Sequence, residues 1–177
     1  MRTFSLLLIA LVLSPFCHAG AQTIFGSSSA EACYQMAIMD SRLTDISPCD
    51  AAIKSGNLTR IDLAATYSNR GIILANSGHL DRAIADHDIA IQLDPESVRA
   101  YINRANTLFR AHRYAEALTD YDRAIDLSAG AFAVAYYNRS FVHLALAQKD
   151  QARKDLEHAA ALAPSVQVYQ DALKGTN

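Results

Sequence analysis

The sequence predicts an all-α solenoid, in which similar helical hairpins stack in a row. The pattern Tyr-x-Asn-Arg-small occurs three times, beginning at Tyr67, Tyr101 and Tyr136. The steps between these tyrosines are 34 and 35 residues, and each step holds two runs of apolar residues at helical spacing. Self-similarity at such a period indicates one supersecondary unit that buries its apolar face against the next copy.

Residues 1–21 have the features of a cleaved signal peptide. Arg2 gives a positive start, residues 6–13 form an uncharged apolar core, and residues 19–21 (Ala-Gly-Ala) fit a signal peptidase site. The alternative is a membrane anchor, but the apolar run is shorter than the ~20 residues that a spanning helix needs. We therefore expect an exported protein, periplasmic or secreted, with no membrane insertion after cleavage.

A degenerate hairpin is expected over residues 29–58, after a flexible leader over 22–28. A capping box at Ser28 and Glu31 predicts the start of its first helix. Ser47 followed by Pro48 predicts the N-cap and first position of its second helix, which Gly56 ends.

Two cysteines, Cys33 and Cys49, remain once the signal peptide is removed. An exported chain meets an oxidising compartment, where an even number of cysteines favours a disulfide. The alternative is two separate buried thiols. We expect the bridge.

The regular hairpins cover residues 59–164, with approximate repeat bounds of 64–97, 98–132 and 133–166. Thr59 and Asp62 form an N-terminal capping pattern, and Gly78 separates the two helices of the first hairpin. Residues 165–177 are predicted to hold a capping helix and a tail, because an open stack otherwise leaves its last apolar face bare.

Small residues recur at fixed positions of each unit, where two helices must approach within 8–10 Å. They are Gly71, Ala105 and Ser140 at the eighth position, Ala83, Ala117 and Ala152 at the twentieth, and Ala90, Ala124 and Ala159 at the twenty-seventh. With these positions, residues 64–164 resemble the tetratricopeptide repeat family, and the whole chain resembles its small exported bacterial members. The resemblance implies a right-handed solenoid with about three repeats, whose first helices line a concave face for another protein or peptide.

An arginine and an aspartate recur together in every unit. The arginines are Arg70, Arg104 and Arg139, and the aspartates sixteen residues later are Asp86, Asp120 and Asp155. We expect an ion pair within each hairpin or between adjacent hairpins, because an Arg–carboxylate fork satisfies a partly buried guanidinium. The alternative is a ladder of charges that binds a ligand.

Asparagine occupies the sixth position of every unit, which faces the concave side in the family. A row of amides can hydrogen-bond an extended peptide backbone, although each Asn could instead satisfy a neighbouring helix. The expected groove residues are Asn69, Asn103, Asn138, Arg99, Ile102, Asn106, Phe109, Arg110, Tyr137 and Phe141. An apolar floor with two cations suits a peptide that has a hydrophobic anchor and an acidic group.

The sequence offers little to support other kinds of function. The formal net charge of -2 gives no general attraction to nucleic acid. The histidines lack zinc-binding spacing, and no nucleophile or nucleotide motif occurs, so we expect no metal, no cofactor and no catalysis. The leading prediction is a protein–protein interaction module of the cell envelope; the alternative is a self-associating subunit of an envelope or secretion assembly.

Overall fold

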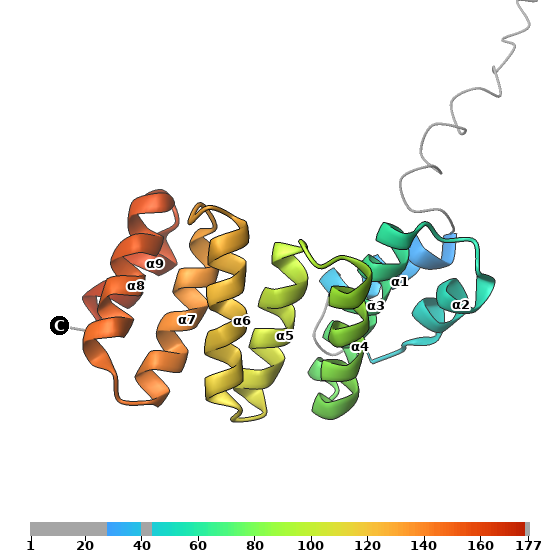
Figure 1. Cartoon of the computed structure of the whole chain (residues 1–177), viewed down its shortest axis with the longest axis horizontal. Helices are drawn as coiled ribbons and strands as arrows, with labels where there is room; N and C mark the ends of the chain where they lie inside the picture. Colours follow the sequence, from blue (N-terminus) through green and yellow to red (C-terminus); the bar gives the residue numbers. More distant parts are fainter. Residues whose placement is uncertain (1–27, 40–43, 176–177) are drawn as a thin grey trace, which may run out of the picture.

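The protein is a row of α-helices along one axis (Figure 1). The computed structural model describes residues 28–39 and 44–175 of the 177-residue chain. These residues form nine helices and no strand, which confirms the predicted all-α solenoid. Their bounds are α1 Ser28–Met39, α2 Ser47–Ser55, α3 Arg60–Asn76, α4 Leu80–Leu93, α5 Val98–Arg110, α6 Tyr114–Leu127, α7 Ala133–Ala145, α8 Lys149–Leu162 and α9 Gln167–Lys174. The predicted signal peptide and residues 22–27 of the predicted leader lie outside the described residues.

Helices α1 and α2 form the N-terminal hairpin, at one end of the row (Figure 1). A disulfide joins Cys33 to Cys49, whose Cα atoms are 4.7 Å apart. Both cysteines are fully buried and pack against Ile73 of α3. The bridge thus lies at the contact between the N-terminal hairpin and the first regular one.

The start of α2 differs by one residue from the prediction. Ser47 is the first helical residue rather than the N-cap, and Pro48 follows it. The reason is local: the Asp45 carboxylate accepts a hydrogen bond from the Ser47 backbone N–H at 2.9 Å, so this amide is satisfied from outside the helix. Gly56 ends α2 in the left-handed conformation, with φ of 68°, as its residue type favours.

The regular hairpins are α3–α4, α5–α6 and α7–α8. The hydroxyl of Thr59 caps α3 by accepting from the Asp62 N–H at 3.2 Å and donating to the Asp62 carboxylate at 2.7 Å. The small residue at the eighth position also has its predicted role. A β-carbon on Gly71 would lie only 2.5 Å from Cε1 of His87, so the two helices of the first hairpin meet here without a side chain between them.

The turn inside each regular hairpin uses one left-handed residue at the same repeat position. These residues are Gly78, His112 and Ala147, with φ of 83°, 57° and 58°. Only glycine adopts this conformation without a steric cost between its β-carbon and the following carbonyl. The second and third hairpins therefore carry a backbone cost that the first avoids.

Helix α9 packs on α8 at the C-terminal end of the row (Figure 1). The ring of Tyr169 lies 4.7 Å from that of Tyr137 in α7, and the Gln170 amide donates to the Ala160 carbonyl at 3.4 Å. Although α9 covers the last hairpin, none of its own residues is buried. Among the described residues, no helix combines the length and the apolar character needed to cross a bilayer.

Candidate functional site

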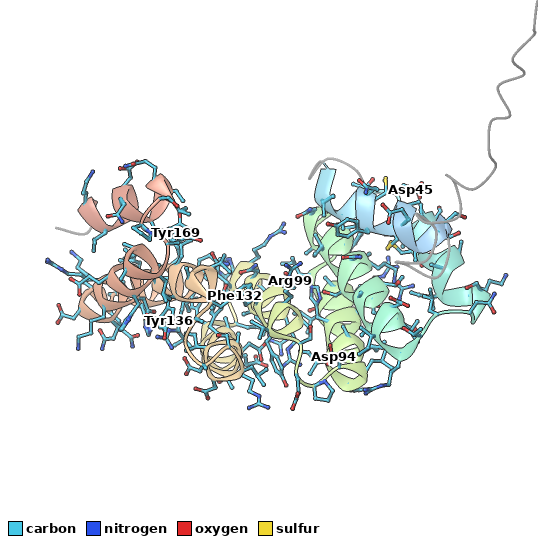
Figure 2. All side chains as sticks on the ribbon, turned by 90° about the horizontal axis from the view of Figure 1, so that it is seen from above. Asp45, Asp94, Arg99, Phe132, Tyr136 and Tyr169 are labelled. Atoms are coloured by element: carbon cyan, nitrogen blue, oxygen red, sulfur yellow. A yellow bond between two sulfur atoms is a disulfide. The ribbon has the colours of Figure 1, made fainter. Side chains whose placement is uncertain are left out.

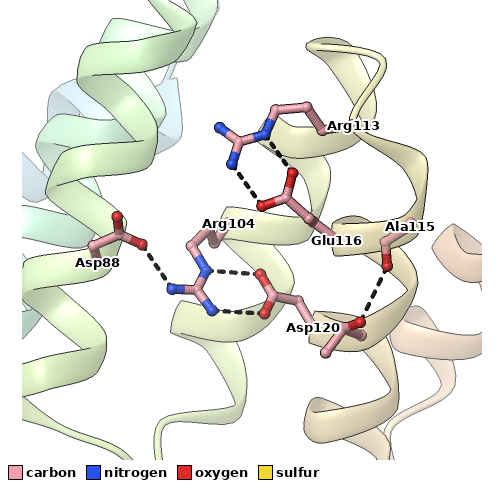
Figure 3. Close-up of polar contacts among 7 residues, drawn as sticks. Asp88, Arg104, Arg113, Ala115, Glu116 and Asp120 are labelled. Carbon is pink, nitrogen blue, oxygen red and sulfur yellow. Dashed lines mark hydrogen bonds and ion pairs between the residues drawn. The ribbon is translucent and has the colours of Figure 1, made fainter.

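The recurring arginines join each hairpin to itself and to the preceding one. Arg104 donates through Nε and Nη2 to both carboxylate oxygens of Asp120, at 2.7 Å each, and through Nη1 to Asp88 at 2.6 Å (Figure 3). Asp120 belongs to the same hairpin as Arg104, whereas Asp88 belongs to the hairpin before it. The ion pair within a hairpin and the ion pair between adjacent hairpins are thus both confirmed, and one guanidinium makes both.

The same arrangement occurs at the other two arginines. Its members are Arg70 with Asp86 and Asp50, and Arg139 with Asp155 and Asp122. The bonded carboxylates raise the pKa of each arginine further above its usual value. We call these three arginines and their six carboxylates the ionic ladder. Because Asp50 lies in α2, the ladder also attaches the N-terminal hairpin.

The tyrosines of the repeated pattern support the same ladder. The guanidinium carbons of Arg70, Arg104 and Arg139 lie 5.2, 5.7 and 5.4 Å from the ring centres of the tyrosines three residues earlier. Contacts of this kind stabilise a cation by the negative face of the ring. The tyrosine and the arginine of the pattern thus have structural partners in every unit.

A cleft of about 630 Å³ lies on the side of the stack where the first helices of the hairpins gather. Figure 2 shows this hollow side from above, with Arg99 pointing into it from α5. Six of the predicted groove residues line the cleft: Asn69, Arg99, Ile102, Asn103, Asn106 and Asn138. The side chain of Ile102 is only 5 % exposed, so it belongs mainly to the hydrophobic core.

Four predicted groove residues lie outside this cleft. Phe109 packs against the core, Arg110 donates to the Asn76 side chain at 3.4 Å, and Tyr137 and Phe141 contact each other with ring centres 4.9 Å apart. Helix α9 also places its own Tyr169 against Tyr137. The groove role of these four residues stays a prediction.

Three of the four asparagines in the cleft bond to side chains of other helices. Asn103 donates from Nδ2 to the Ser68 hydroxyl at 3.0 Å, and Asn138 donates from Nδ2 to Oδ1 of Asn106 at 2.9 Å. The hydroxyl of Tyr121 donates to the same Asn106 oxygen. Asn103, Asn106 and Asn138 therefore each bond to a neighbouring helix and also line the cleft, while the contact of the amides with a peptide stays a prediction.

These bonds determine which polar atoms of the amides remain unpaired. The Oδ1 atoms of Asn103 and Asn138 and the Nδ2 of Asn106 have no partner among the described residues, and Asn69 has no side-chain bond there either. The cleft thus has both unpaired acceptors and unpaired donors, and those of Asn103, Asn106 and Asn138 are oriented by bonds between hairpins. A peptide backbone, which alternates donors and acceptors, could pair with both kinds of atom.

Sequence reasoning missed an apolar wall contributed by α1 and by the first turn of α3. Tyr34 and Ile38 of α1 line the cleft beside Ile61, and the two isoleucines are 55 % and 52 % exposed. Exposed isoleucines are informative when they gather in a concave site. No sequence signal places α1 against α3, because the N-terminal hairpin does not follow the repeat register.

A second unusual group is His87, which is fully buried on α4 beside Gly71. Neither ring nitrogen has a hydrogen-bond partner among the described residues. Burial, helped by the charge of Arg104, lowers the pKa of His87 from 6.5 to about 4, so the ring is neutral at pH 7. The described residues bring no three metal-binding side chains together, so His87 is not part of a metal cluster there.

Comparison with protein families identifies the two hairpins behind this geometry. Residues 98–128 and 133–166 each match a model of the tetratricopeptide repeat. The chain contains tetratricopeptide repeats. The resemblance predicted from the sequence is confirmed to that extent, and the tetratricopeptide hairpins α5–α6 and α7–α8 supply Arg99, Asn103, Asn106 and Asn138 of the cleft.

A curated relative and two solved structures agree with this assignment. The chain is 38 % identical over 98 residues to human tetratricopeptide repeat protein 36, a match that covers 52 % of the chain and 51 % of the relative. It is similar to the first tetratricopeptide domain of Spaghetti (RPAP3) bound to the HSP90 peptide SRMEEVD, at 26 % identity and a TM-score of 0.60 over 64 % of this chain and 89 % of that one. It also shares its fold with the MamA protein, at 18 % identity and a TM-score of 0.64 over 84 % and 80 %. The chain thus spans about half the length of the curated relative.

Proposed function

We propose that the protein is a non-catalytic binding module that holds an extended segment of another protein in the cleft between α1, α3, α5 and α7. The observation that carries the proposal is the amide row, in which bonds between hairpins orient the unpaired Oδ1 atoms of Asn103 and Asn138 and the unpaired Nδ2 of Asn106. The similar Spaghetti domain is bound to a peptide of HSP90, which supports a peptide as the class of ligand. Export to an oxidising compartment, where the Cys33–Cys49 disulfide is stable, is part of the same proposal.

The bound segment carries an acidic group that meets Arg99. Arg99 is exposed in the cleft and forms no ion pair among the described residues, whereas the arginines of the ionic ladder are all paired. An unpaired guanidinium in a partly enclosed site favours a carboxylate, which it can bind through two parallel hydrogen bonds. The apolar residues of the cleft favour a hydrophobic side chain near that group.

Selection from a library of random dodecapeptides on the oxidised full chain tests this proposal. We expect enriched peptides that combine a large apolar residue with Asp or Glu and that bind at least tenfold more weakly to Arg99→Ala and Asn69→Ala. Arg123→Ala, which removes an exposed arginine of α6 outside the cleft, is the matched control and should bind as the wild type does. Failure to enrich any peptide, or equal binding by all these variants, contradicts the proposal.

Self-association is the second candidate function. Its support is the C-terminal end of the stack, where Leu162 and Val168 are 43 % and 51 % exposed and α9 has no buried residue. Light scattering after size-exclusion chromatography distinguishes the two candidates. A stable oligomer that Val168→Asp breaks into monomers favours self-association, and a monomer at micromolar concentration rules it out under those conditions.

A further inference from the structure

The N-terminal hairpin contributes one complete side of the cleft. Tyr34 and Ile38 are one helical turn apart on α1, so both reach the same side of that helix. Ile61 joins them from the first turn of α3. More than half of each isoleucine side chain is exposed, which leaves an apolar surface that no described residue covers. We call Tyr34, Ile38 and Ile61 the apolar wall.

The apolar wall and the polar residues of the cleft come from different parts of the chain. Arg99 and the bonded asparagines belong to the regular hairpins, which the ionic ladder and a continuous core hold in place. Two of the three wall residues belong to α1, which lies outside the ladder. A ligand that fills the cleft must therefore contact both α1 and the regular hairpins, and the ionic ladder that joins the hairpins does not include α1.

The disulfide attaches α1 covalently, beside the packing of Met36 and Ala37 against the cluster of Cys33, Cys49 and Ile73. Among the described side chains of this helix, only Ala30 and Cys33 are buried, whereas α3 buries seven residues. Cys33 directly precedes Tyr34, and its bridge leads to Cys49 of α2, one residue before the Asp50 that binds Arg70. The covalent bond thus connects the apolar wall to the ionic ladder through two adjacent residues.

We infer that the apolar wall receives a large hydrophobic side chain of the bound segment, and that the Cys33–Cys49 disulfide holds this wall in its binding position. The occupant is a peptide segment that places one large aliphatic or aromatic residue on the wall and an acidic group at Arg99. This inference rests on the proposed function and adds to it a selectivity site and a dependence on oxidation state. Reduction by a dithiol would transfer two electrons and two protons to the pair, giving two thiols and the reductant's own disulfide.

The test uses a fluorescently labelled dodecapeptide selected as above, with its Kd measured by anisotropy on the full chain. Ile38→Ala is expected to weaken binding at least tenfold in the oxidised protein. Val168→Ala is the matched control, because this side chain is equally exposed but lies on α9, away from the cleft. Replacing the large apolar residue of the peptide by Ala should weaken wild-type binding and have little further effect on Ile38→Ala.

The role of the disulfide is measured on the same peptide. Dithiothreitol is expected to weaken binding to the wild type at least fivefold and to leave the already weaker Cys33→Ala/Cys49→Ala variant unchanged. Circular dichroism of the reduced wild type and of the double cysteine variant reports whether the regular hairpins remain folded. The oxidised Ile38→Ala variant tests the apolar wall whether or not those two proteins stay folded. If binding depends on Arg99 and Asn69 but not on Ile38 or on reduction, the inference is wrong and the proposed function stands. If binding depends on none of these residues, both are wrong.

Discussion

The buried histidine of the first hairpin makes the stability of the protein depend on pH. His87 is fully buried on α4, and its nitrogens lack partners in the part of the chain that the structure describes. Burial lowers its pKa in the folded state from 6.5 to about 4. The unfolded chain therefore binds this proton at a higher pH than the folded protein does. The stabilising contribution is complete above pH 6.5 and is lost progressively as the pH falls toward 4.

The size of the effect follows from that difference in pKa. One unit corresponds to about 1.36 kcal/mol, so the whole shift amounts to about 3 kcal/mol. Between pH 7.5 and pH 5.0 the linkage relation gives a loss of about 2 kcal/mol in the free energy of unfolding. This window lies above the range in which most carboxylates titrate, which keeps their contribution small.

Urea unfolding followed by circular dichroism at pH 7.5 and pH 5.0 measures this loss. His87→Leu is the control, because Leu156 occupies the equivalent position of the third hairpin and is 1 % exposed. The variant retains the other histidines, so the difference between the two proteins isolates His87. We expect the wild type to lose about 2 kcal/mol more than the variant between these pH values. Equal losses in the two proteins would refute the reasoning.

Two further predictions concern stability. Arg104→Ala leaves the Asp120 carboxylate, which is only 5 % exposed, without its partner, and should lower the free energy of unfolding by about 3 kcal/mol. The control is Arg113→Ala, which breaks the exposed pair with Glu116 and should leave the free energy of unfolding nearly unchanged. Urea unfolding measures both, and equal effects would contradict the structural role of the ladder. Ala147→Gly removes a left-handed alanine and should stabilise the protein by about 0.5–1 kcal/mol in thermal unfolding. The control is Ala131→Gly, at an exposed residue without positive φ, which should not stabilise the protein. A loss of stability in Ala147→Gly would contradict the argument.

The sequence predicted the regular hairpins because their signals are local and repeated. The cap at Thr59 and the pairing of Arg104 with Asp120 were expected from spacing alone, and both occur. The sequence did not specify the additional bond from Arg104 to Asp88, because spacing within one unit does not determine which residue of the preceding unit it contacts.

The candidate site was only partly predictable. The repeat register placed Asn103 and Asn138 beside the cleft, because every unit presents its sixth position in the same direction. It did not indicate that α9 contacts Tyr137, and it missed Ile38, whose helix lies outside the register. Both differences arise at the ends of the row, where the contacts depend on elements that do not repeat.

The ionic ladder also determines in which direction the stack loses structure. Each rung joins two successive hairpins, and the first rung reaches Asp50 in the N-terminal hairpin, so that end opens only by breaking an Arg–Asp contact. At the other end, Glu157 occupies the position of Asp88 and Asp122 but pairs with Arg153 of its own helix, and α9 contains no arginine. Fraying should therefore begin at α9 and proceed toward the N-terminus, and amide hydrogen exchange should show α9 exchanging before α3. The two ends of the row thus differ in stability: the cleft lies toward the end that the first rung and the disulfide stabilise, and unfolding starts at the other end.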